Sequence, residues 1–515
     1  MTVATSAPVR RRAPRATSVV PRNALRLLRV ELRRNAMPWM LPLIAVLFWF
    51  DSYRPSLSTA PLYGVRTFWN MGQGHTIGDF APFVAGVAAW MGSRDGRRGL
   101  ADLVTATARP RWAAQLATWA ATAIWAVAAY LVFVGAMFAM YAHQGVGGTP
   151  PWWWVAVGAT AVAAFSAAGF AVGACWPSRF AAPVAAFGTF LALAMSSKFG
   201  FSQTSGWALI LPANSNGNFQ TDSGIFYPWL PDLPIARVMF LAGIAVAALG
   251  LTGLPARAGG RRLRRAAAVL TLAGVASAGT AVGLARTARL SAHGMVIPAL
   301  HDAANDAPIR YAPACGLAAG VAVCVNPAYR RWLPDVTAAL APVLTEVAGL
   351  PGAPARASQA AAAYSSGEGG MGRPMTLGGQ PPVLRMSLGL LNMPGSCGFC
   401  NGPVATNQFA GQVRLAFGHT FVGAGIGSGS PAQQAVQAAL LQGAGVPFTE
   451  QPKALAIAGL PMSGPGGQNG PGPAAGPVYA AARRLAALPA TTQHAWLTAH
   501  LAALRAGQLT LQDLP

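Results

Sequence analysis

Charged residues are scarce in this sequence. They make up 10% of its 515 residues, against roughly 25% in an ordinary soluble protein, while hydrophobic residues make up 53%. This balance excludes an intrinsically disordered chain and argues against a purely soluble enzyme. Acidic residues are especially few: 14 stand against 37 basic residues, which gives a formal charge of +23. Such an excess is typical of proteins that meet nucleic acid or a membrane surface, and the positions of the arginines distinguish the two.

Hydrophobic runs take the place of the missing charge. Between Arg111 and Arg179 there is no charged residue, and the turn-forming segment 145–151 divides this stretch in two. A membrane-spanning helix needs roughly 20 apolar residues to cross a hydrocarbon core about 30 Å thick. By this measure we predict seven spans, of which the first, second and fifth are short, at 36–53, 77–93, 115–140, 152–176, 180–197, 236–254 and 266–285.

The charge of the connecting segments predicts the orientation. If the N-terminus is cytoplasmic, the cytoplasmic segments carry a net charge of +17, the opposite segments +2 and residues 290–515 +4. Because cytoplasmic loops are rich in Lys and Arg, we expect this orientation in the cell membrane, with the C-terminal residues outside. About 35 basic and polar residues precede the first span, which favours an uncleaved anchor over a signal peptide. The basic clusters lie near span ends and lack interleaved aromatic residues, so we expect no nucleic-acid partner.

The segment 21–35 has the pattern of an amphipathic helix. Its residues form a leucine stripe and an arginine stripe: Leu25, Leu28 and Leu32, and Arg22, Arg26, Arg29 and Arg33. Such a helix would lie along the inner membrane surface, with its leucines in lipid and its arginines toward anionic headgroups. A solvated basic tail that extends the first span is the alternative.

The segment 90–112, between the second and third spans, joins a charged turn, an amphipathic pair and an Ala-Arg-Pro-Arg stop. Here the sequence resembles the permease subunits of type-2 ATP-binding-cassette (ABC) exporters, whose corresponding loop reads Arg, acid, basic pair, Gly, and then a short helix ending in Pro and Arg. The matching residues are Arg94, Asp95, Arg97, Arg98, Gly99, Asp102, Leu103, Pro110 and Arg111. The resemblance implies that loop 94–111 docks on an ATPase subunit.

The predicted coupling residues of this loop are Arg94, Asp95, Arg97, Arg98, Asp102, Leu103, Arg109 and Arg111. An inner loop with ordinary cytoplasmic arginines is the alternative. The resemblance covers about 1–255: a cytoplasmic basic tail and interfacial helix at 1–35, and a six-helix permease-like domain at 36–255. The chain departs from the family pattern in a basic hinge with a seventh span at 256–289, which leads to residues 290–515.

Catalytic motifs are missing from the sequence. A phosphate-binding Walker loop needs a Lys after its glycines, and the two lysines, Lys198 and Lys453, stand in other contexts. No His in 290–515 is followed by Glu, as a zinc protease requires, and there is no G-x-S-x-G nucleophile elbow. We therefore predict a protein that is not an enzyme, with no cofactor and no metal, and expect ATP hydrolysis on a partner chain.

Five cysteines are present, and four of them lie in 290–515. Cys315 and Cys324 bracket a short apolar segment, and Cys397 and Cys400 form a second close pair. Outside the membrane the environment permits disulfides, so we expect two local ones. A thiol-redox site at Cys-Gly-Phe-Cys and a four-cysteine zinc site are the alternatives. Cys175 is expected to be a small buried residue at the inner end of the fourth span.

Residues 290–515 alternate patterns of strands and helices, which predicts an extracytoplasmic α+β domain. The expected strands and helices are 321–325 and 383–391, and 329–347, 431–442, 478–488 and 491–506. The segments 324–354 and 494–515 resemble the extracytoplasmic domain appended to actinobacterial transporter permeases. The predicted fold class is thus a mostly α-helical integral membrane protein with about seven transmembrane helices and a C-terminal α+β domain.

These observations favour one function and leave an alternative. The leading hypothesis is the permease subunit of an ABC transporter, an exporter, whose partners are an ABC-type ATPase subunit, membrane lipid and a second permease, either a copy of this chain or a paired one. The alternative is a non-transporting membrane anchor that displays a binding or assembly domain outside. An outer-face hydrolase or redox enzyme is the weakest hypothesis.

Overall fold

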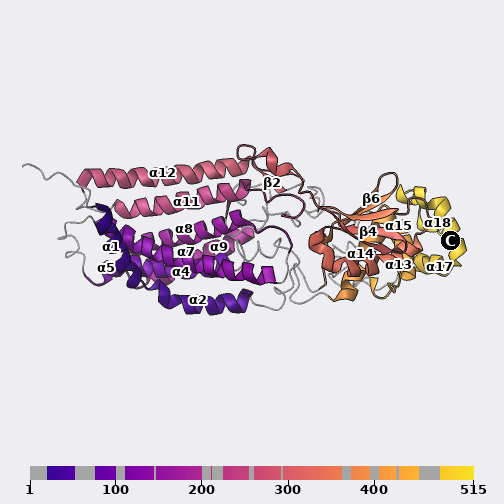
Figure 1. The fold of residues 1–515 in the computed structure, drawn as a ribbon, viewed down its shortest axis with the longest axis horizontal. Coiled ribbons are helices and arrows are strands. Elements are labelled where there is room, and N and C mark those ends of the chain that lie inside the picture. The colour runs from indigo at the N-terminus through magenta and orange to yellow at the C-terminus, as the bar shows by residue number, and fades with distance from the viewer. Residues whose placement is uncertain are drawn as a thin grey trace, which may run out of the picture.

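The computed structural model consists of a long helical bundle followed by a smaller part built around a β-sheet (Figure 1). Helices predominate, as the sequence predicts. The structure describes residues 20–52, 76–99, 111–143, 147–199, 210–211, 224–254, 260–291, 294–361, 373–391, 393–394, 405–424, 429–451 and 476–515.

Among the described residues, four helices of the bundle are long and apolar enough to cross a membrane. They are α7 (Arg111–His143), α8 (Trp152–Cys175), α11 (Asp232–Gly253) and α12 (Gly260–Arg286). Three helices with shorter apolar segments accompany them in the bundle: α2 (Met37–Ser52), α4 (Thr76–Gly92) and α9 (Ala181–Phe199) (Figure 1). Each of the seven predicted stretches therefore falls on a helix, the form in which a chain satisfies its own backbone hydrogen bonds in lipid.

Small residues let the bundle helices approach closely. On α8, Gly169 and Gly173 stand four residues apart on one face, and a side chain at either position would collide with the carbonyl oxygen of Ala85 or Ala89 on α4. The pair α11 and α12 packs in the same way, with glycines and alanines facing each other. Because lipid is as apolar as leucine, such close packing, and not hydrophobic burial, holds helices together in a membrane.

The arginine-rich elements gather at one end of the bundle, which we call the basic end. It contains α1 (Val20–Arg33), α5 (Arg94–Arg97) and the start of α12, whose arginines at 261, 262, 264 and 265 are exposed (Figure 1). The helix predicted at 21–35 is present as α1. The sheet-containing part lies beyond the opposite end, which we call the domain end.

The C-terminal part is organised by a mixed five-stranded sheet. After α12, the hairpin of β1 (Arg289–Ser291) and β2 (Gly294–Val296) leads into it. The sheet has the order β3-β4-β5-β7-β6, in which β4, β5 and β7 are parallel to one another and the two edge strands are antiparallel to their neighbours. The strands are β3 (Ala314–Ala318), β4 (Val321–Val325), β5 (Arg356–Gln359), β6 (Met375–Gly378) and β7 (Val383–Met386).

Helices cover one face of this sheet, and no described helix covers the other face. α13 contacts β3 and β4, α14 contacts β6, and α15 packs against both helices. Leu340 and Phe409 belong to the apolar core between these layers, while Leu317 and Arg385 are exposed on the other face. The helices and short 3-10 turns are η3 (Ala303–Asp306), η4 (Pro327–Trp332), α13 (Leu333–Glu346), η5 (Leu388–Leu390), α14 (Thr406–Phe421), α15 (Pro431–Gly443), α17 (Pro477–Ala486), α18 (Ala490–Arg505) and η6 (Leu511–Asp513).

Local signals explain where several of these elements begin and turn. Ser430 and Gln433 bond each other's backbone N–H groups and so start α15, at distances of 3.3 and 2.8 Å. Ala319 and Gly320 form the two-residue turn between β3 and β4, both with positive φ, as a tight hairpin turn of this kind requires.

The cysteine predictions have mixed outcomes. Cys315 and Cys324 form the expected disulfide across the β3–β4 hairpin. Cys397 and Cys400 lie outside the described residues. The expectation that Cys175 is buried is wrong: it is exposed at the end of α8, because its position on the helix points away from the packed neighbours.

Candidate functional site

The predicted coupling loop begins at the basic end with a charged contact to the amphipathic helix. Arg94, at the start of α5, donates two hydrogen bonds to Glu31 of α1, from Nη1 to Oε2 at 3.2 Å and from Nη2 to Oε1 at 3.0 Å. The two side chains are 23% and 12% exposed, so the pair is partly shielded from water. Burial alone lowers the pKa of Arg94, but the bond and charge of Glu31 outweigh it and raise the pKa above its ordinary value.

Further polar contacts fix α1 to the bundle. Trp125 of α7 donates its indole N–H to the carbonyl of Leu32 at 3.0 Å. Asn35 donates to the Thr122 hydroxyl at 2.8 Å, and both groups are buried. An ion pair therefore joins α1 to α5, and hydrogen bonds join the α1 segment to α7. If α5 moves, either α1 moves with it or these contacts resist the movement.

Arg97 is folded back onto its own helix end. Its guanidinium lies 3.4 Å from the centre of the Trp90 ring, and it donates to the Ser93 hydroxyl at 3.0 Å and to the Trp90 carbonyl at 2.9 Å. Burial, and next the charge of Arg98, lower the pKa of Arg97. Arg97 thus stabilises the turn between α4 and α5 and is not extended toward a partner.

The turn packs on the neighbouring connection between α8 and α9. A Cβ at Gly96 would collide with the ring of Pro177, so the two short segments are in direct contact. Arg98 and Gly99 are exposed beyond this contact, and Asp95 lies 3.5 Å from Arg94. Of the predicted coupling residues in this turn, Arg98 is therefore the exposed one.

Of the other four predicted coupling residues, the structure describes only Arg111. Arg111 begins α7, and the neighbouring Trp112 donates to the Leu249 carbonyl near the end of α11. Asp102, Leu103 and Arg109 lie outside the described residues. Within the described ranges, the structure brings Arg94, Asp95, Arg97 and Arg98 into one short turn, held between α1 and the α8–α9 connection.

At the domain end, loops of the bundle contact the sheet-containing part. The N–H of Ile309 donates to the carbonyl of Phe226 at 2.8 Å, and the rings of Phe226 and Tyr311 meet edge to face at 5.6 Å. Phe226 precedes α11 in the chain, yet it belongs to the apolar core of the C-terminal part. This contact connects the bundle to the C-terminal part independently of the chain that follows α12.

A histidine between two carboxylates strengthens this junction. His301 Nδ1 lies 3.1 Å from Asp232 Oδ2, and His301 Nε2 lies 3.1 Å from Asp306 Oδ2. Asp232 is fully buried in the first turn of α11 and also accepts the Ile297 N–H at 2.9 Å. The hydrogen bond to Asp306 is the main cause that raises the pKa of His301, and the charge of Asp232 adds to it. Each ring nitrogen faces a carboxylate oxygen, and an imidazolium can donate from both nitrogens. This arrangement therefore favours the protonated histidine.

The sequence gives little sign of this junction or of a second buried charge, Arg237. Asp232 and His301 are 69 residues apart, and no local pattern joins them. Arg237 lies in α11 with no exposed surface, its guanidinium 5.1 Å from the centre of the Trp154 ring of α8. Its position near the start of an apolar run resembles that of an ordinary interfacial arginine, and only helix packing reveals that it is enclosed. Ionisable residues inside packed membrane helices are rare and mark candidate functional positions.

Comparison of the chain with protein-family models, with curated proteins and with solved structures finds no match. In the described part of the chain, no group of three or more His, Cys, Asp or Glu side chains is arranged to hold a metal ion. The charge distribution and the contacts at the two ends of the bundle are therefore the features that bear on function.

Proposed function

We propose that this chain is the membrane subunit of an ABC transporter, an exporter, that couples to a separate ATPase chain through loop 94–111. In this proposal seven helices cross the cell membrane, the basic end faces the cytoplasm, and residues 290–515 lie outside. The excess of arginine at the basic end supports the orientation, since cytoplasmic segments retain Lys and Arg. ATP is hydrolysed on the partner.

The Glu31–Arg94 ion pair is the observation that carries this proposal. A docking surface transmits movement only if it is joined firmly to the helices that must move. Arg94 joins α5 to α1, and α5 follows α4 directly, which packs on α8 at Gly169 and Gly173. A push on the exposed side of α5 would therefore reach α1, α4 and α8 together.

The accessible apolar faces fit the other proposed partners. Phe187 of α9 is 66% exposed and Leu272 of α12 is 69% exposed, although both lie in apolar helices. Membrane lipid or a second permease would cover such faces. The leucine side of α1 would lie in the headgroup region of the inner leaflet.

Charge reversal at the turn tests the coupling surface. We expect Arg98→Glu to reduce recovery of the ATPase subunit that copurifies with the full chain, by roughly tenfold, as expected when an interfacial ion pair becomes a repulsion. Arg265→Glu is the matched control, because Arg265 is also exposed at the basic end but lies on α12. Equal recovery with the wild-type chain and with both variants would contradict the proposal.

The second candidate is a membrane anchor that displays a binding domain. The observation in its favour is an open hollow beside an edge strand of the C-terminal sheet, described below. Deleting residues 290–515 separates the two candidates. The transporter proposal expects ATPase stimulation to survive the deletion, whereas the anchor proposal expects every activity to be lost while the helices remain folded.

A further inference from the structure

Strand β3 leaves one side of its backbone open. It is the first strand of the sheet and pairs only with β4 among the described residues. In the β3–β4 hairpin Cys315 stands opposite Cys324, with their Cα atoms 4.1 Å apart. Directly opposite residues this close form a pair without mutual backbone hydrogen bonds, since hydrogen-bonded pairs are about 5.5 Å apart. The N–H and C=O of Cys315 therefore point away from β4.

Because hydrogen-bonded and non-hydrogen-bonded pairs alternate along the hairpin, the backbone N–H and C=O of Leu317 also point away from β4. The two-residue turn between Ala318 and Val321 makes these two residues a hydrogen-bonded pair, so Gly316 and Ala314 also bond to β4 while Leu317 and Cys315 do not. Two independent features, the closing turn and the Cα distance, give the same assignment. The free edge thus offers the N–H and C=O groups of two residues, spaced as an added strand requires.

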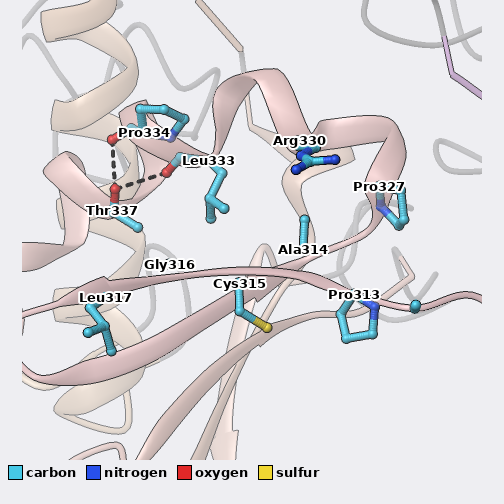
Figure 2. Close-up of a pocket in the computed structure, with 11 residues that line it drawn as sticks. Pro313, Ala314, Cys315, Gly316, Leu317, Pro327, Arg330, Leu333, Pro334 and Thr337 are labelled. Carbon is cyan, nitrogen blue, oxygen red and sulfur yellow. Dashed lines mark hydrogen bonds between the residues drawn. The ribbon is translucent and has the colours of Figure 1, made fainter.

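A hollow of about 610 Å³ lies beside this edge, between β3 and the start of α13. Figure 2 shows Leu333, Pro334 and Thr337 above Gly316, while the side chains of Cys315 and Leu317 point to the other side of the strand. Gly316 lets α13 lie close over the strand, because a Cβ there would come 3.2 Å from Thr337 Cγ2. The Thr337 hydroxyl donates to carbonyls of its own helix, with oxygens 3.0 and 2.8 Å away, so the hollow meets mainly apolar groups.

One charge stands at the side of this hollow. Arg330 of η4 is exposed, and in the described part of the chain it is the one charged residue in the lining. Figure 2 places it above Ala314, two residues along the strand from Gly316. An apolar space beside Gly316 and a cation near Ala314, the next residue on the same face, specify what an added strand must carry.

We propose that the β3 edge and this hollow bind an extended peptide segment of another protein, which carries an apolar residue and a carboxylate two residues apart. The peptide would add a strand to the sheet, and main-chain hydrogen bonds to Cys315 and Leu317 would hold it. Because alternate side chains of a strand face the same side, the apolar side chain of the added strand enters the hollow beside Gly316 and the carboxylate meets Arg330.

Charge favours such a peptide over a second copy of this chain. Edge-to-edge pairing of two copies would place β3 against β3, and residues 314–318 contain no acidic side chain to meet Arg330. Edge strands that must stay unpaired are usually protected by charge or proline. Here Pro313 stands only at the beginning of the strand, which leaves the rest available.

Peptide binding to the full chain in lipid nanodiscs tests the proposal. The probe is a fluorescent peptide, Thr-Val-Thr-Leu-Thr-Glu, read by anisotropy. Two altered peptides accompany it, one with Lys in place of Glu and one with N-methyl groups on the amides that face the strand. We expect the first peptide to bind and both altered peptides to bind at least about tenfold more weakly, since each loses a charge-assisted or backbone hydrogen bond.

A charge swap on the protein completes the test. Arg330→Glu is expected to weaken binding of the Glu peptide by about tenfold and to strengthen binding of the Lys peptide. Arg385→Glu is the matched control, on the opposite face of the same sheet, and should leave both affinities within about twofold. The proposal is overturned if the Glu peptide fails to bind the wild-type chain, if N-methylation has no effect, or if the edge is already occupied by a second copy, seen as peptide binding that disappears as the protein dimerises.

Discussion

The two ends of the bundle are held together by different kinds of contact. At the basic end, the Glu31–Arg94 pair and the bonds of Asn35 and Trp125 join α1 to helices far away in the sequence. At the domain end, the apolar core of the sheet-containing part includes Phe226, and Asp232 contacts His301. The basic end is therefore held mainly by a few specific bonds, and the domain end mainly by apolar packing.

The stabilising force also differs between the two regions. Water surrounds the C-terminal part in our proposal, so burial of large side chains stabilises it. In the same proposal lipid surrounds the bundle, so the fit of glycine against backbone matters more there than apolar burial. Substitutions in each region separate these forces.

Truncating the core of the C-terminal part should have the largest effect. Leu340 of α13 is fully buried, and Leu340→Ala is expected to lower the free energy of unfolding by about 2–5 kcal/mol, through lost burial and the cavity that remains. Leu317→Ala, at a leucine that is 74% exposed, should change it by no more than about 0.5 kcal/mol. Denaturant unfolding of the purified chain measures both. Equal effects of the two substitutions would contradict this assignment of the core.

In the bundle, adding one methyl group should be harmful where helices touch. Gly173→Ala would drive a Cβ into the Ala89 carbonyl, at a cost of about 1–3 kcal/mol from overpacking. The matched change Gly188→Ala on α9 meets nothing within 4 Å and should be neutral or slightly stabilising, since alanine favours the helix. Thermal unfolding in detergent compares them. A Gly173→Ala variant as stable as the wild type would show that α4 and α8 are not in close contact.

At the basic end, removing one charge should release α1. Glu31→Gln leaves Arg94 without its ionised partner, and we expect a loss of about 1 kcal/mol, because both side chains keep some exposure to water. Backbone hydrogen exchange in α1 should become faster. Asp95→Asn is the control, since Asp95 makes only a longer contact of 3.5 Å with Arg94. Equal exchange rates in the two variants would show that the ion pair does not hold α1 to α5.

Sequence patterns anticipated features that depend on neighbouring residues. The stripe of leucines in α1, the arginine-rich turn at 94–99 and the cysteines of the β3–β4 hairpin all have their signals within a few residues. Helix α14 was not predicted, because its residues mix Gly, Thr and Asn with the apolar positions and so weaken the helical period. Strands β5 and β6 have only four residues each, too few to show an alternation.

The missed site residues depend on how separate elements meet. His301 stands between carboxylates from α11 and η3, and Arg237 becomes enclosed only when α8 packs on α11. Neither arrangement has a counterpart in the spacing of residues along the chain. The exposure of Cys175 likewise follows from the rotation of α8 against its neighbours, which hydrophobicity alone does not determine.

The smallest expected effect is a pH dependence of the domain end. The raised pKa of His301 means that the folded chain holds its proton more tightly than the unfolded chain does. The protonated histidine therefore stabilises the junction fully below pH about 6.5, the ordinary histidine pKa, and this contribution is lost as the pH rises through the raised value.

Hydrogen exchange at Ile297 reports this loss directly, because its N–H bonds to the same Asp232 oxygen that faces His301. We expect exchange, corrected for its intrinsic pH dependence, to become faster above that window in the wild-type chain, while protection of the basic end stays constant. His301→Gln should remove the pH dependence and His500→Gln should retain it, since His500 contacts Trp496 in α18. Slower exchange at higher pH would contradict the prediction. It would show that the neutral imidazole, and not the protonated one, stabilises the contact between the two parts.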